Sequence, residues 1–170
     1  MAGNWPSGAG MIVPGILSQS RSAAPPPSGA TYRYFRINFT ARTRASFIAM
    51  SEIDALIGGS PVTLSGLSYV DSGAAVGGSG GTLADLFDGN HSTYWNFSTD
   101  PPRRITIDMG SPTSIDTFGI RSNNSSFSSL AYGPAGFVIL GSNDGSVYDT
   151  LLTVTGQPIW GLAERRAFTL

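Results

Sequence analysis

Between residues 32 and 40 the chain alternates apolar and polar side chains with a period of two. The segment YRYFRINFT has two distinct faces, one made of Arg33, Phe35, Ile37 and Phe39 and the other of Tyr32, Tyr34, Arg36 and Asn38. Successive side chains of a β-strand point to opposite faces of the sheet, so this period predicts a strand. We expect the folded part of the chain to begin at Tyr32.

Short runs rich in β-branched and aromatic residues recur to the end of the chain, bounded by Gly, Pro, Asn or Ser. They cover residues 45–57, 61–70, 103–110, 114–122, 135–142, 147–154 and 164–170. Thr82 is placed to cap a single helical turn over 83–86. Strands at this spacing predict an all-β fold, an antiparallel jelly-roll β-sandwich of about eight strands.

Residues 1–31 differ from the rest. The segments GNWPSGAG and SAAPPPSGA are rich in Gly, Pro and Ser, and between them lies the apolar stretch MIVPGIL, which Pro14 and Gly15 interrupt. We expect an extended N-terminal arm, with a disordered tail as the alternative. As an arm it would dock on a partner protein, or form a homo-oligomer, through Trp5, Met11, Ile12, Val13, Ile16 and Leu17.

Charge and cysteine content narrow the function classes. The net charge is -1, all ten cations are arginine, and they cluster only in pairs. This argues against nucleic-acid binding, which needs a basic face. The chain has no cysteine, which favours folding in a reducing cytoplasm. We expect neither a signal peptide nor membrane insertion, because no segment has the required apolar length.

The sequence offers little catalytic chemistry. There is one histidine, His91, and no G-x-S-x-G motif. The two glutamates, Glu52 and Glu164, have no pattern that would place them across a cleft as in a glycosidase. We therefore expect a non-enzymatic protein.

The segment LFDGNHSTYWNFS, residues 86–98, has the composition of a cation loop. Asp88 supplies a carboxylate, Gly89 allows a tight turn, and Asn90 and Thr93 supply further oxygens. Calcium takes six to eight oxygen ligands, so one such loop is not enough and a second carboxylate is required. The alternative is an Asx turn that needs no metal, and the local sequence favours it.

Three segments in order, LADLFDGNHSTYW, RRITIDMG and GFVILGSNDG, resemble the discoidin, or coagulation-factor type C, family of galactose-binding-like domains. The resemblance implies an eight-stranded jelly roll. It also implies that Trp95 lies in the core between the sheets. Together the segments span residues 83–145, which makes the resemblance more specific than any one motif.

One departure concerns the order of the segments. Those resembling the family's closing strands, YRYFRINFT and AMSEIDAL, open this chain at residues 32–40 and 49–56. The arrangement therefore looks circularly permuted, which is reasonable where domain termini lie close together. The resemblance implies a structural calcium beside the loop, with main-chain oxygens near Ser51 and Asp85, and with side-chain ligands Glu52, Asp88, Asn90 and Thr93.

Family members bind cell-surface glycans, lipids or proteins through loops at one end of the sandwich. The candidate loops here are residues 121–136 and 155–164. Sugar recognition needs exposed aromatic faces with polar partners. The candidate ligand-binding residues are Phe127, Tyr132, Trp160, Asn123 and Asn124. The alternative is that these rings cover the ends of the core.

Permuted modules that open with YRYxRI resemble those of tailed-phage virion proteins. We therefore expect a phage virion accessory protein, made in the host bacterial cytoplasm. Its arm, residues 1–31, would dock on other capsid or tail proteins, and its jelly roll, residues 32–170, would bind host-surface carbohydrate. One alternative is a decoration or cement protein with no sugar ligand. Another is a carbohydrate-binding module of a bacterial polysaccharide-degrading system.

Overall fold

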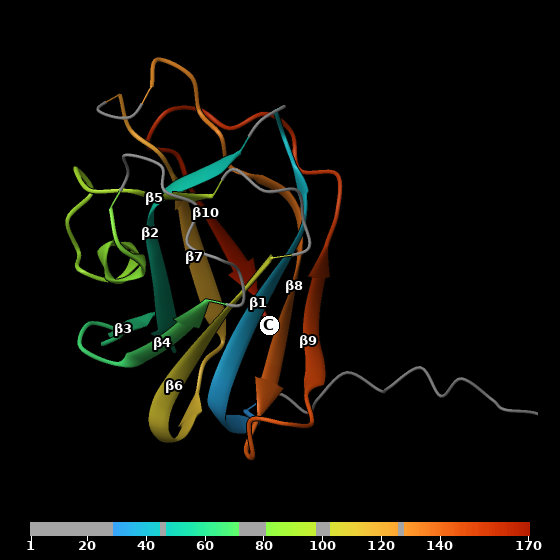
Figure 1. The fold of residues 1–170 in the computed structure, drawn as a ribbon. Helices are drawn as coiled ribbons and strands as arrows, with labels where there is room; N and C mark the ends of the chain where they lie inside the picture. The colour runs from blue at the N-terminus through green and yellow to red at the C-terminus, as the bar shows by residue number, and fades with distance from the viewer. Residues whose placement is uncertain (1–28, 45–46, 72–80, 98–102, 126–127) are drawn as a thin grey trace, which may run out of the picture.

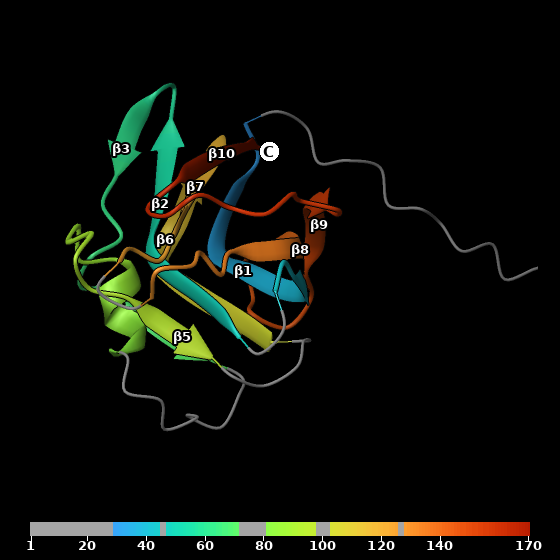
Figure 2. The same ribbon diagram turned by 90° about the horizontal axis from the view of Figure 1, so that it is seen from above.

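The computed structural model describes residues 29–44, 47–71, 81–97, 103–125 and 128–170. They form two antiparallel sheets that face each other (Figure 1), and Figure 2 views the same sandwich from above. In spatial order, the first sheet contains β4 (Ser68–Asp71), β6 (Arg103–Ser114), β1 (Thr31–Arg42), β8 (Pro134–Ser142) and β9 (Asp149–Val154). The second contains β10 (Arg165–Thr169), β7 (Thr117–Ser122), β2 (Ile48–Ile57) and β3 (Ser60–Val62), and β5 (Trp95–Phe97) also pairs with β2.

The predicted all-β sandwich is confirmed. The described residues contain ten strands rather than about eight, and β3 and β5 are only three residues long. The predicted helical turn is a 3-10 helix, η1 (Leu83–Leu86). Its start is fixed by the Thr82 amide, which donates to Asp85 Oδ2 at 2.5 Å. No helix in this described part is long and apolar enough to cross a membrane.

β1 is the central strand of the first sheet and pairs antiparallel with both β6 and β8. As predicted, Phe35, Ile37 and Phe39 point into the core and are at most 1% exposed. The face assigned to Tyr32 and Arg33 is wrong, because the pairing with β6 shifts register between Tyr32 and Tyr34. Tyr32 turns inward and is 8% exposed. Arg33 turns outward, and its Nε lies 2.8 Å from Asp108 Oδ1.

The core is filled by rings from both sheets. Phe35 of β1 lies edge-on to Phe118 of β7, with ring centroids 5.6 Å apart. Phe39 of β1 contacts Phe97 of β5 at 5.5 Å. Trp95 is 6% exposed and packs against Phe97 at 5.0 Å, so the expected core position of this tryptophan is confirmed. The Phe35–Phe118 and Phe39–Phe97 pairs hold the two sheets together.

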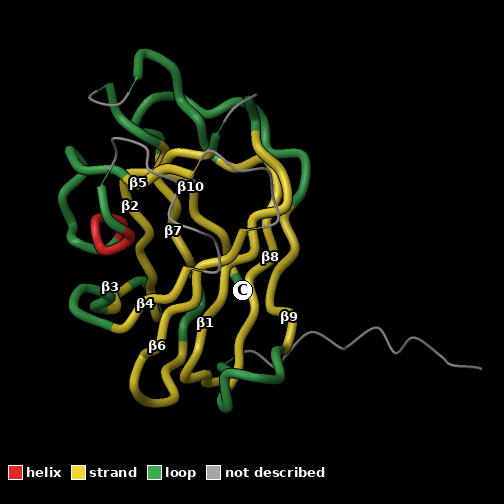
Figure 3. The backbone as a smooth tube through the Cα atoms, in the orientation of Figure 1, coloured by secondary structure: helices red, strands yellow, loops and turns green. Residues whose placement is uncertain are grey.

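The long connections gather at one end of the sandwich (loops in Figure 3). We call this end the loop pole. It comprises Phe47 and the described parts of residues 121–136 and 155–164. The two loops are joined to each other, since the Ala163 amide donates to the Asn123 carbonyl at 3.0 Å and Ser122 Oγ donates to the Gly161 carbonyl at 2.6 Å. The β6–β7 and β8–β9 turns lie at the opposite pole (Figure 1).

Trp160 closes the core at the loop pole. Its side chain is 2% exposed, and its Nε1 donates to the Pro134 carbonyl at 2.9 Å. The guanidinium of Arg166 covers one ring face, 4.2 Å from the centroid. Gly133 packs against the ring so closely that an added Cβ would lie 2.4 Å from ring atoms. The indole therefore anchors the 155–164 loop.

We predict that Gly133→Ala destabilises the protein by about 1–3 kcal/mol, because the new methyl group overpacks the Trp160 site. Thermal unfolding of the full chain measures the effect. Gly161→Ala is the matched control, since its Cβ would make only ordinary contact, 3.4 Å from Glu164 Oε2. Equal melting temperatures for the two variants would contradict this account of the packing.

The β8–β9 turn, with the sequence SNDG, is organised by Asp144. Its Oδ1 accepts hydrogen bonds from the Val147 amide at 2.9 Å, the Ser146 amide at 2.8 Å and Ser142 Oγ at 2.9 Å. These bonds, the one from Val147 first, hold the pKa of Asp144 well below its usual range. The ionised carboxylate therefore stabilises the turn.

We predict a pH-dependent effect of Asp144→Ala. The pKa of this carboxyl is lower in the folded chain, so its stabilisation is present at neutral pH and is lost as the pH falls through the folded value. The variant should melt below the wild type at about pH 7, and the difference should shrink toward about pH 3. A difference that stays constant between these pH values would show that Asp144 does not act through its charge.

Candidate functional site

The loop at Asp88–Thr93 is closed by its own hydrogen bonds. Asp88 Oδ1 accepts from the Asn90 amide at 2.7 Å, and Thr93 Oγ1 donates toward Asp88 Oδ2 at 3.1 Å. Thr93 Oγ1 also lies 2.6 Å from the Asn90 carbonyl, which accepts the Thr93 amide at 3.1 Å. The Asn90 side chain accepts the Ser92 amide at 3.1 Å. The Asx turn expected from local sequence is confirmed.

Glu52 of β2 lies beside this loop, although 36 residues separate it from Gly89 in the sequence. Its side chain accepts a hydrogen bond from the Gly89 amide. Glu52 is only 6% exposed, and its Oε2 is buried with no hydrogen-bond partner among the residues that the structure describes. Burial, followed by the nearby charges of Asp88 and Asp54, raises the pKa of Glu52 to about 7.

A cavity of about 190 Å³ opens between these residues and the segment before β4. It is lined by Glu52, Asp54, Asp88, Gly89 and neighbouring residues of 62–65. No three His, Cys, Asp or Glu side chains of the described residues gather closely enough to hold a metal ion. A cation here would need main-chain and amide oxygens to complete its shell, as calcium accepts.

The structure therefore brings three of the four predicted metal ligands into one turn and places the fourth, Glu52, beside it. Asp88, Asn90 and Thr93 share one hydrogen-bonded turn, and Glu52 approaches it from β2 through Gly89. The unpartnered Glu52 Oε2 fits a cation, because a buried carboxylate oxygen needs a donor or a positive charge. The oxygens of Asn90 are less suited to bind a cation, because they already accept hydrogen bonds from Ser92 and Thr93.

Two of the predicted ligand-binding residues lie in the interior instead. Trp160 is 2% exposed, which corrects the expectation that its ring faces a sugar. Asn123 is fully buried, its Oδ1 accepting the Tyr132 amide at 2.8 Å and its Nδ2 donating to the Leu130 carbonyl at 2.9 Å. Both side chains hold the loops in place. For Trp160 this agrees with the alternative that its ring covers an end of the core.

The other candidates lie nearer the surface. Tyr132 is half-buried, and its ring packs on Phe47 with centroids 4.3 Å apart. Asn124 is half-buried, and its Nδ2 donates to the carbonyl of His91, an exposed residue. This contact joins the 121–136 loop to the loop of residues 88–93. Phe127 lies outside the described residues.

Phe47 is a pole residue that the sequence did not single out. It stands just before β2, within a segment whose pattern indicates a strand, and no local motif distinguishes it. Its position becomes clear only from the structure, where the start of β2 lies beside residues 131–132 and the Ala49 amide donates to the Tyr132 carbonyl at 2.9 Å.

The six predicted docking residues, Trp5, Met11, Ile12, Val13, Ile16 and Leu17, lie outside the described part.

Comparison with known proteins supports the resemblance seen in the motifs. No curated protein and no solved structure matches this chain. One family model does match, over residues 85–168, and it describes the NedA-like, galactose-binding domain of the coagulation factor 5/8 type C group. The matched region runs from η1 through β10 and includes both loops of the loop pole. Residues 85–168 are therefore similar to the NedA-like, galactose-binding domain family, as the motifs at residues 83–95 and in the two later strands indicate.

Proposed function

We propose that the protein is a non-enzymatic carbohydrate-binding module that recognises sugar at the loop pole. The observation that carries this proposal is the galactose-binding family match, which includes both pole loops. Rigid loops favour binding, because little conformational entropy is lost when the ligand arrives. The buried Asn123 and Trp160 provide this rigidity, each through hydrogen bonds to neighbouring backbone.

The binding surface centres on Tyr132 and Asn124. The Tyr132 ring, supported from one side by Phe47, is suited to pack against the apolar face of a sugar. The Asn124 amide carries donor and acceptor groups for hydroxyls. Phe127 stands three residues after Asn124 in the sequence and is the third candidate.

We place this module on a phage virion, as an accessory protein of capsid or tail that binds host-surface carbohydrate. Three features support the placement: the opening YRYFRI, the absence of cysteine and the apolar stretch within residues 1–31. The position of Gly29 adds to them, since β1 begins at the pole opposite the loops. An arm of residues 1–28 that docked on other virion proteins would leave the loop pole free, and several weak sites on one particle would gain avidity.

A structural role, as a decoration or cement protein without a sugar ligand, has one observation in its favour. The loop pole also carries exposed apolar side chains, with Leu130 at 45%, Ile159 at 58% and Leu162 at 42% exposure. Such residues on joined loops form a surface that another protein could cover. The sugar-binding test distinguishes this role from the first.

Calcium is the cofactor that we propose for the loop of residues 88–93. The buried Glu52 carboxylate, with its unpartnered Oε2, and Asp88 would supply the negative charge. Main-chain oxygens of the same loop would complete the shell. The ion would join β2 to the loop and so hold the β5 segment against the second sheet.

We predict that the full chain binds galactose-containing glycans on an array, and that Tyr132→Ala and Phe127→Ala each weaken binding about tenfold, equivalent to roughly 1.4 kcal/mol. Ile57→Ala is the matched control, because Ile57 is 43% exposed at the far end of β2. If folded protein binds no glycan, the structural role is favoured instead. Equal losses in all three variants would place the sugar site elsewhere.

We predict that calcium raises the melting temperature by about 5–10 °C at one hundred times its dissociation constant, the shift expected from binding energy of about 2.7 kcal/mol. Glu52→Gln and Asp88→Asn should abolish the shift. Asp149→Asn is the control, since this carboxylate binds Tyr32 Oη in the other sheet. An unchanged melting temperature of the wild type with calcium or with chelator would exclude a structural calcium ion.

A further inference from the structure

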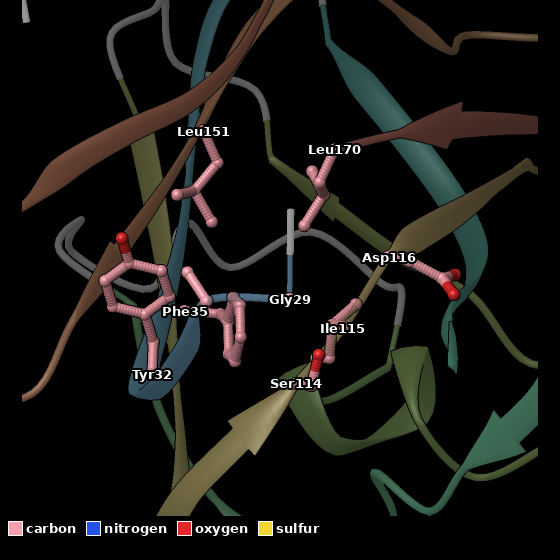
Figure 4. A pocket seen from close by; sticks show the side chains of 9 residues that line it. Gly29, Tyr32, Phe35, Ser114, Ile115, Asp116, Leu151 and Leu170 are labelled. Atoms are coloured by element: carbon pink, nitrogen blue, oxygen red, sulfur yellow. The ribbon is translucent and has the colours of Figure 1, made fainter. Parts of the chain in front are cut away.

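A second cavity lies at the pole opposite the loops. Its volume is about 200 Å³, and Figure 4 shows around it side chains of the first sheet, of the β6–β7 turn and of Leu170, which follows β10. Tyr32 and Phe35 of β1 form one side and Ile115 of the β6–β7 turn another, while Leu151 and Leu170 face each other across the opening. No motif of the sequence pointed to this cavity, because its walls come from segments distant in the chain.

The lining of this cavity is suited to an aliphatic group. Tyr32, Phe35 and Ile115 are at most 8% exposed and form an apolar base. Two of the polar side chains nearby are already engaged, since Tyr32 Oη donates to Asp149 Oδ2 at 3.1 Å and Asp116 Oδ2 accepts the Gly58 amide at 2.5 Å. The hydroxyls of a sugar would find few hydrogen-bond partners here, whereas an apolar side chain gives up no hydrogen bonds to water when it enters.

The size of the cavity limits what can enter. An apolar cavity of about 150 Å³ is large enough to hold a benzene molecule. A cavity of about 200 Å³ therefore accepts one or two aliphatic side chains of a peptide, but no folded element. The occupant should be a short extended segment with closely spaced apolar residues.

The chain itself contains such a segment close to the cavity. Gly29, the first described residue, lines the cavity wall. The apolar stretch MIVPGIL at residues 11–17 precedes it by only eleven residues, 18–28. Eleven residues reach at most about 40 Å when fully extended. The stretch is therefore held near the cavity at an effective concentration on the order of millimolar, so that even weak docking would be populated.

We propose that residues 11–17 dock in the cavity of their own chain, with Ile16 and Leu17 inserted between Leu151 and Leu170. Docking in the same chain is favoured over exchange between copies because the tether starts at the cavity wall. In this state the docked stretch is shielded from water, which limits aggregation of an otherwise apolar arm, and the stretch would leave the cavity when the arm binds other virion proteins. This inference concerns the pole opposite the loops and does not depend on sugar binding.

Paramagnetic NMR on the full chain tests the proposal. The chain has no cysteine, so Ser18→Cys offers a single site for a nitroxide label. The label should cause a loss of methyl signal from Leu151, Leu170 and Ile115. Tethering alone brings the label near Gly29, so the deciding comparison is the same labelled chain with Ile16→Asp and Leu17→Asp. These changes lie outside the described fold and should restore the signals.

A cavity variant supplies the reciprocal test. Leu151→Asp should restore the Leu170 and Ile115 signals, whereas Val70→Asp, at a side chain 61% exposed on β4, should leave the loss unchanged. Signal loss that persists in the Ile16→Asp, Leu17→Asp chain would overturn the proposal. Signal loss found only when labelled and isotope-enriched chains are mixed would overturn docking within one chain, in favour of exchange between copies.

Discussion

The hydrogen bonds along both edges of β1 join parts of the chain that are far apart in sequence. β6 pairs with one edge and β8 with the other, and Phe35 and Phe39 meet rings of the second sheet. Removal of this strand would expose two sheet edges and a large apolar surface. Residues 31–42 are therefore integral to the fold, although they precede the region that matches the family.

The loops of the loop pole likewise depend on one strand, β2. β2 pairs with β7 and β5, and its first residues hold Tyr132 and Asn123 in place through main-chain hydrogen bonds of Ala49. The register of one strand thus determines the shape of the loop pole, where we propose that sugar binds. The loop of residues 88–93 is joined to the same strand through Glu52, so β2 contributes to both candidate sites.

Much of the fold could be predicted from the sequence, because alternation and turn residues are local signals. The runs at 103–110, 135–142 and 147–154 each became a strand, and Trp95 lies in the core. The sites were predicted less well. Trp160 and Asn123 sit in loops rich in polar residues, where local composition suggests exposure, but contacts with Gly133 and Leu130 bury them. The inward turn of Tyr32 depends on a register shift that no local pattern encodes.

The two ends of the folded unit meet on the β6–β7 connection. Thr31 lies opposite Ser114, and the Leu170 amide donates to the Asp116 carbonyl at 2.8 Å. A short linker from Leu170 to Gly29 could close the backbone into a ring, and a cut between Asp71 and Gly81 would then create a chain that starts at η1 and finishes with β4. Every strand pairing would survive this rearrangement, so the architecture does not depend on where synthesis starts. A cargo fused at Gly29 or at Leu170 would leave the folded unit from the same place.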